Sequence, residues 1–76
     1  MIWLAKDDDG SEWAFNYPPE HHQLHTGEWF WARNHEMGTN EFLKKGTIKK
    51  ILGAEIPTDE AILIDNKAYI QKLTKK

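Results

Sequence analysis

The chain has 76 residues, no cysteine and a net charge of −2, so it holds neither a disulfide scaffold nor a thiolate metal site. A chain of this length forms one domain, residues 1–76, stabilised mainly by hydrophobic packing. The apolar run at residues 61–64 is too short to cross a bilayer, and the N-terminus lacks a basic stretch followed by an apolar one. We therefore expect a soluble, unexported protein of the cytoplasm.

Charge is unevenly distributed along the chain. Residues 1–40 contain seven acidic residues against Lys6 and Arg33, whereas residues 41–76 contain eight lysines against five acidic residues. Such a dipolar chain suggests a charged contact face. Runs of charge in small proteins are more often solvated surface that keeps the chain soluble, and this is the favoured interpretation.

The N-terminal part of the chain predicts a β-hairpin. Residues 1–6 read as a first strand, and residues 7–10, Asp-Asp-Asp-Gly, are a turn signal because glycine supplies the positive φ that such turns need. Residues 11–17 are the expected partner strand. Two prolines, residues 18–19, end it because they donate no hydrogen bond to a sheet.

Two more strands are predicted before the helix. The polar residues 20–27 are best read as a loop, and residues 28–33 as the third strand. Residues 35–40 look like another turn, and residues 41–43 form a possible short fourth strand.

The convincing helical pattern lies in residues 46–53. Ile48, Ile51 and Leu52 are spaced so that they share one face, while the lysines point outward. Gly53 is well placed as the residue that ends the helix, and lysines in a last turn suit the negative end of the helix dipole.

The remaining strands complete an α+β fold prediction. Residues 61–64 form an unbroken apolar run typical of a central strand. Residues 65–67 either turn a hairpin into residues 68–73, the favoured reading, or begin a helix that Asp65 caps. We expect a small antiparallel sheet of four to five strands with one short helix packed on one face, where it meets aliphatic side chains and some of the tryptophans.

Two alternating aromatic segments are the most informative feature of the sequence. Trp13, Phe15 and Tyr17 would share one face of a strand, and Trp29 and Trp31 would share a face of another. Together they form either the core of a very small domain or a platform for a ligand. In the second case the candidate binding residues are Trp13, Tyr17, Trp29, Trp31 and Arg33.

Residues 5–15, Ala-Lys-Asp-Asp-Asp-Gly-Ser-Glu-Trp-Ala-Phe, and residues 45–53, Lys-Gly-Thr-Ile-Lys-Lys-Ile-Leu-Gly, resemble small uncharacterised proteins carried by phages and prophages. The resemblance implies a strand hairpin followed by the Lys-Gly-Thr-Ile helix and a short acidic strand. It implies no activity. The histidine-rich segment and the C-terminal segment are not part of the shared pattern.

The histidine-rich segment is the one candidate for a metal site. On a helix, His21 and His25 would stand one turn apart and could both reach one divalent ion. The segment follows two prolines, and a third ligand would have to come from His35 or an acidic residue, so solvated histidines in a loop are the favoured reading. Residues 7–9 do not fit a calcium loop, because the position that needs a bidentate glutamate is Pro18.

No catalytic residues are assigned, because the chain has no thiol, no glycine-rich phosphate loop and only one serine, Ser11, without a sequence-level partner. The leading hypothesis is a non-enzymatic phage or prophage protein that binds or inhibits a host macromolecule, a host protein in the first place. It would act without a cofactor or membrane, as a monomer or homodimer. The alternatives are a single-stranded nucleic-acid binder that uses the aromatic strands, and a histidine-dependent metal-binding protein.

Overall fold

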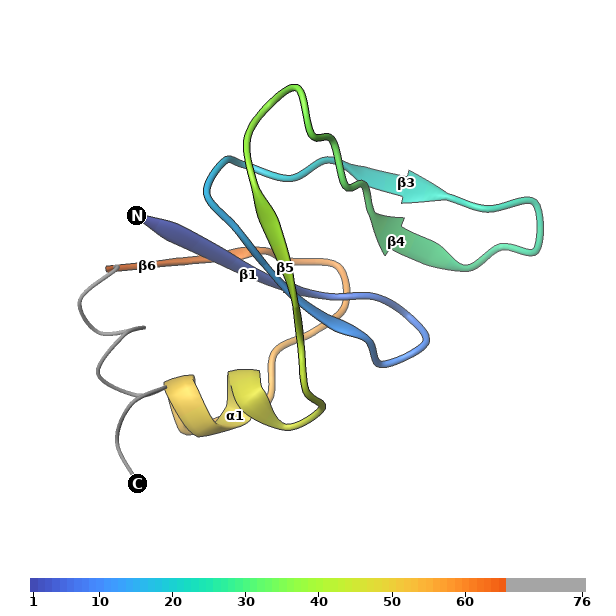
Figure 1. Ribbon diagram of the computed structural model, residues 1–76. Helices are drawn as coiled ribbons and strands as arrows, with labels where there is room; N and C mark the ends of the chain where they lie inside the picture. The colour runs from blue at the N-terminus through green and yellow to red at the C-terminus, as the bar shows by residue number, and fades with distance from the viewer. Residues whose placement is uncertain (66–76) are drawn as a thin grey trace.

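The computed structural model describes residues 1–65, and within them the chain has the predicted α+β fold (Figure 1). The elements are β1 (Ile2–Lys6), β2 (Glu12–Phe15), β3 (His21–Gln23), β4 (Trp29–Trp31), β5 (Asn40–Leu43), α1 (Thr47–Leu52) and β6 (Ile62–Ile64). Four strands form one antiparallel sheet in the order β5-β2-β1-β6, and β3 and β4 form a separate hairpin. The predicted hairpin or helix at residues 68–73 lies outside the described residues.

The first hairpin is confirmed. Strands β1 and β2 pair antiparallel from Trp3 opposite Phe15 to Lys6 opposite Glu12. The turn between them is closed by the Gly10 N–H, which donates to the Asp7 carbonyl at 2.9 Å, and Gly10 has a φ of 91°. Only glycine adopts that backbone conformation without a steric penalty, so the turn signal has its expected physical basis.

The predicted loop at residues 20–27 is wrong in part, because β3 lies within it. His21 pairs with Trp31 and Gln23 with Trp29, and the hairpin turn is closed by a 2.7 Å hydrogen bond from the Leu24 N–H to the Glu28 carbonyl. Polar residues have low strand propensity, and here the aromatic partner strand supplies the cross-strand contacts that hold them. The predicted third strand is present as β4, in this hairpin instead of the main sheet.

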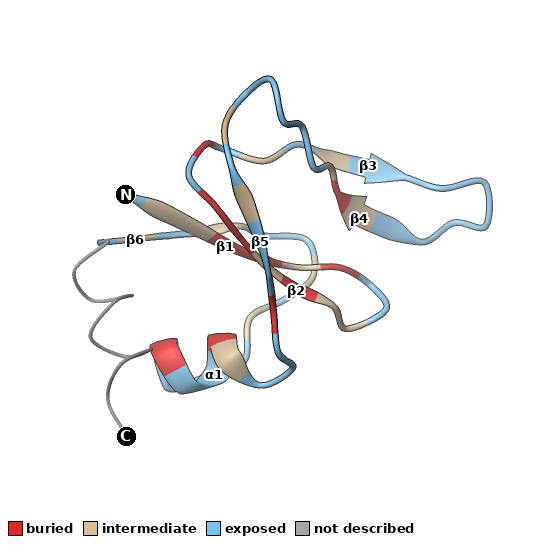
Figure 2. Cartoon of the chain, viewed as in Figure 1, coloured by how far each residue is buried: buried red, intermediate tan, exposed pale blue. Residues whose placement is uncertain are grey.

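The main sheet is apolar on both faces. The face beside α1 carries an aliphatic cluster, and the opposite face carries an aromatic one. The first cluster contains Leu4, Ala14, Leu43, Ile48 and Ile51, and the second contains Ala5, Phe15, Tyr17 and Trp31. Figure 2 shows the buried residues where β1 and β2 cross the middle of the sheet, while the tip of the β3-β4 hairpin is exposed.

The expectation that α1 packs against tryptophan is wrong. Side chains alternate along a strand, so Leu4 of β1 faces the helix while Trp3 faces the aromatic side, and in β2 Ala14 and Trp13 divide in the same way. In the described residues, the helix therefore meets an aliphatic surface. Trp3 and Trp13 lie on the opposite face of the sheet, against the cluster that contains Trp31 of the β3-β4 hairpin.

A buried carboxylate from β2 caps the N-terminus of the helix. Gly46, the residue before the first turn, has no side chain to cap it, and the Glu12 carboxylate accepts hydrogen bonds from the Gly46 and Ile48 N–H groups, each at 2.8 Å. This carboxylate supplies the negative group that a helix N-terminus favours. At the other end, Gly53 terminates the helix as predicted, with φ at 81°.

Strand β6 differs from the predicted central strand. Among the described residues it pairs with β1 alone and lies at one end of the sheet, with Leu63 exposed. Within residues 1–65, no helix has the length and apolar character that crossing a membrane requires.

Candidate functional site

The β3-β4 hairpin is held against the sheet by the turn that joins β1 and β2. The Trp31 N–H donates to Asp7 Oδ1 at 2.7 Å, and the Trp29 N–H donates to Asp8 Oδ2 at 2.9 Å. The Asp8 N–H in turn donates to the Trp29 carbonyl at 3.1 Å. The hydrogen bond from the Trp29 backbone, followed by one involving Thr58, holds the pKa of Asp8 below its usual value. The acidic turn therefore docks the second hairpin.

Trp31 is the side chain by which the hairpin enters the core. Only 6% of its surface is exposed, and it packs in the aromatic cluster. Its indole N–H is shared between the Lys6 and Thr58 carbonyls, each 3.1 Å away. The ring stacks on His21 with 4.3 Å between centroids. A buried, hydrogen-bonded tryptophan of this kind is part of the domain's interior.

Arg33 lies between the hairpin and the sheet and joins their aromatic residues. Its guanidinium donates to Asp7 Oδ2 at 2.9 Å and to the Trp31 carbonyl at 2.7 Å. The same group lies 4.3 Å from the Trp13 ring centroid and 5.9 Å from that of Phe30. Both distances are within the range in which a cation and an aromatic ring attract.

These contacts form a continuous row of three aromatic rings and one guanidinium, which we name the aromatic strip: Phe42, Trp13, Arg33 and Phe30. Phe42 and Trp13 meet edge to face with centroids 5.1 Å apart. The Trp13 indole nitrogen is buried without a hydrogen-bond partner among the described residues, so the ring is held by its contacts with Phe42 and Arg33 and by packing. At one end of the strip, Phe42 is 63% exposed, which makes it the most open large ring in the described part of the chain.

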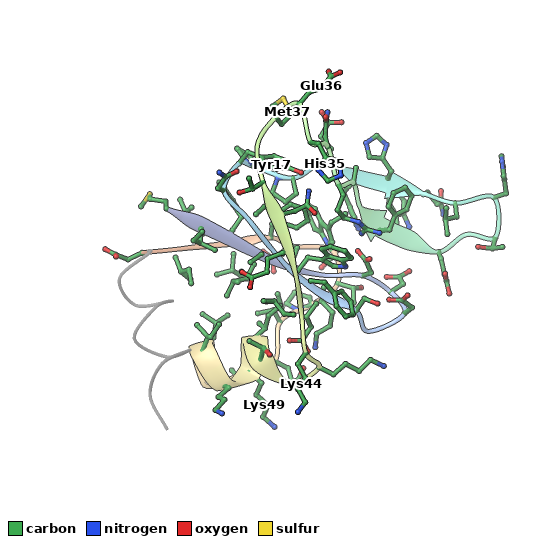
Figure 3. All side chains as sticks on the ribbon, viewed as in Figure 1. Tyr17, His35, Glu36, Met37, Lys44 and Lys49 are labelled. Atoms are coloured by element: carbon green, nitrogen blue, oxygen red, sulfur yellow. The ribbon has the colours of Figure 1, made fainter. Side chains whose placement is uncertain are left out.

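Two depressions flank Arg33. The hairpin depression, about 240 Å³ in volume, is lined by Asp7, Asp9, Leu24, Glu28, Trp29, Phe30 and Arg33. A second depression, about 250 Å³, is lined by Tyr17, Pro18, Glu20, His22, Ala32, Arg33, Asn34 and Met37. Figure 3 places Met37 and Glu36 together at the far end of the loop that leads from β4 to β5. The two depressions therefore share the Arg33 side chain.

The five candidate binding residues divide between surface and core. Trp13 and Arg33 belong to the aromatic strip, and Trp29 is 40% exposed beside the hairpin depression. Tyr17 and Trp31 are buried. The Tyr17 hydroxyl accepts a 2.8 Å hydrogen bond from the Asn34 N–H, which fixes the chain where it leaves the hairpin.

Phe30 and Phe42 were missed by the sequence reasoning. Each stands next to an apolar residue that is buried, Trp31 in β4 and Leu43 in β5. Because adjacent residues of a strand point to opposite faces, one member of such a pair must face away from the cluster that the other joins. This alternation was the available signal.

The histidines do not form the proposed pair on a helix. His21 is part of β3 and lies between Trp29 and Trp31, while His25 lies in the hairpin turn. The His22 Nε2 lies 3.0 Å from Glu20 Oε1. Within residues 1–65, no three histidine, aspartate or glutamate side chains gather closely enough to hold a metal ion. The geometry of this region is that of stacked rings.

No family model, curated protein or solved structure matches this chain.

Proposed function

We propose that this chain is a non-enzymatic binding protein of phage or prophage type that occupies a host protein through the aromatic strip. One observation carries the proposal: the strip ends in a largely exposed phenylalanine although the domain already has two buried apolar clusters. An exposed ring costs a small domain solubility, and contiguous apolar surface of this kind marks interaction sites. Aromatic residues and arginine are also the types enriched at binding hot spots.

Charge around the strip favours a basic partner surface. Asp8, Asp9 and Glu28 are all exposed, and they lie in or next to the part of the hairpin that borders the strip. Acidic groups at the rim of an interface speed association with a basic partner and repel acidic ones. The resemblance of residues 5–15 and 45–53 to phage and prophage proteins supports a partner in the host cytoplasm, where binding would inhibit or redirect that partner.

Single-stranded nucleic acid is the second candidate, because rings beside an arginine can stack bases. Binding to the phosphate backbone needs free cations along the same path. The arginine of the strip is already paired with Asp7, and the groups around it are acidic. The distribution of charge therefore favours a protein partner over a nucleic acid.

Capture from a host extract tests the proposal. Tagged protein is incubated with bacterial extract, with and without nuclease, and bound material is identified by mass spectrometry. The variant Phe42→Ser removes the exposed end of the strip, and Met37→Ser is the matched control, because Met37 is 58% exposed outside the strip. Both variants should fold as the wild type does, which circular dichroism checks.

We expect a nuclease-resistant host protein in stoichiometric amount, retained by Met37→Ser and lost with Phe42→Ser. Recovery of nucleic acid alone would replace the proposal with the second candidate. Capture of the same protein by Phe42→Ser at the wild-type level would remove the strip as the contact surface.

A further inference from the structure

The hairpin depression has the size of a single side chain. Its volume is about 240 Å³, below the roughly 300–1,000 Å³ of pockets that hold whole small-molecule ligands. Leu24 and Phe30 supply apolar lining, and Leu24 is among the exposed large hydrophobic residues of the chain. Such a site would take a long side chain presented by a partner.

The charges around the depression leave an acidic excess. Three carboxylates and one guanidinium line it, and the guanidinium of Arg33 is bound to Asp7 and to the Trp31 carbonyl. Its positive charge is therefore already matched within the protein. The negative charge of the depression therefore comes from the two remaining carboxylates, those of Asp9 and Glu28.

The two remaining carboxylates differ in how far the protein itself satisfies them. Asp9 Oδ1 accepts the Ser11 N–H at 2.8 Å. Hydrogen bonds from Ser11 and, to a smaller degree, the positive charge of Lys45 lower the pKa of Asp9, so it is ionised at neutral pH. Glu28 is exposed and has neither a hydrogen bond nor an ion pair through its side chain within residues 1–65. Glu28 is thus the group most available to an outside cation.

We infer that the hairpin depression receives a basic side chain, lysine or arginine, of the partner protein. The aliphatic stem of that side chain would lie against Leu24 and Phe30 while its charged end meets Glu28 and Asp9. The inference rests on the proposed function and adds to it the chemistry of the partner: an exposed basic residue beside an apolar surface that covers the aromatic strip.

The test uses a small probe, so that it does not depend on capturing the partner. N-acetyl-arginine methylamide is titrated into the ¹⁵N-labelled full chain, and amide shifts are followed by NMR. N-acetyl-citrulline methylamide, which has the same shape without the charge, is the control ligand. Glu28→Lys reverses the charge in the depression, and Glu36→Lys is the matched control, because Glu36 is exposed at the loop tip (Figure 3).

The arginine probe should shift residues 7–9 and 24–33, more weakly at high salt, and Glu28→Lys should weaken binding by about fivefold or more while Glu36→Lys leaves it unchanged. Equal binding of the citrulline probe, shifts elsewhere on the protein, or full binding by Glu28→Lys would overturn the inference. A host protein captured by the wild type and by Glu28→Lys alike would also overturn it and leave the proposed function standing. Probe binding without any captured protein would support the site and count against the function.

Discussion

Removal of the Glu12 side chain should destabilise the protein although Glu12 is a charged residue. Only 4% of Glu12 is exposed, and its carboxylate receives the N–H groups of Gly46 and Ile48. In Glu12→Ala the buried Ile48 N–H loses its acceptor, which costs about 1–3 kcal/mol, and the more accessible Gly46 N–H exchanges a charged acceptor for water at about 0.5–1.5 kcal/mol. Together the two effects give an expected loss of about 1.5–4.5 kcal/mol.

Such a loss is large for this domain. At about 0.05–0.15 kcal/mol per residue, a chain of 76 residues has about 4–11 kcal/mol of stability. Urea denaturation followed by circular dichroism measures the change, with the slope of the transition unchanged. Glu12→Gln keeps one acceptor oxygen and should fall between the wild type and Glu12→Ala, whereas Glu36→Ala, in an exposed loop, should stay within about 0.5 kcal/mol. A Glu12→Ala variant as stable as Glu36→Ala would refute the role of this carboxylate in starting the helix.

The other predictions concern the aromatic residues, the acidic turn and the loop before β5. Trp31→Ala should cost about 3–5 kcal/mol, a large share of the domain's stability, whereas Trp29→Ala should cost about 1 kcal/mol; thermal melts of both distinguish them, and equal melting temperatures would contradict the difference in burial. Because the pKa of Asp8 in the folded protein lies below 3.8, the ionised carboxylate contributes fully to folding stability above that pH, and this stability is lost as the pH falls through the lowered pKa. A carboxyl NMR titration of Asp8 with a midpoint at 3.8 or higher would contradict this. Gly38→Ala would place a Cβ onto the Asn16 side-chain oxygen and 2.9 Å from Tyr17 Cδ1, so denaturation should show a loss of about 1–3 kcal/mol, and no measurable loss would mean that the loop moves aside freely.

Local signals were sufficient for the first hairpin and the helix. The Asp-Asp-Asp-Gly turn and the spacing of Ile48, Ile51 and Leu52 act over a few residues, and both elements have the expected positions. Strand β3 was not predictable in this way. Its hairpin is fixed by hydrogen bonds from β4 to aspartates more than twenty residues earlier in the chain, and contacts at that separation leave no periodic trace in a polar segment.

At the candidate site too, contacts between distant parts of the chain decided what the sequence could not predict. Alternation correctly implied that Trp13, Phe15 and Tyr17 share a face, but it does not say which rings a second layer will cover. Docking of the hairpin buries its own Trp31 together with Tyr17 in the aromatic cluster and leaves Trp29 exposed, a result set by where the Asp7 and Asp8 carboxylates hold β4. The sequence therefore identified the right group of residues without dividing it into core and surface.

Hydrogen exchange of the tryptophan indole N–H groups, followed by NMR on the ¹⁵N-labelled protein, tests that division most directly. The Trp31 indole N–H donates to two carbonyls in the interior and should exchange only when the whole domain unfolds, while that of the exposed Trp29 should exchange close to the rate of a free indole. Rapid exchange at Trp31, as fast as at Trp29, would mean that this ring is not buried between the hairpin and the sheet, and the aromatic strip, which depends on the same docking of the hairpin, would then not exist as described.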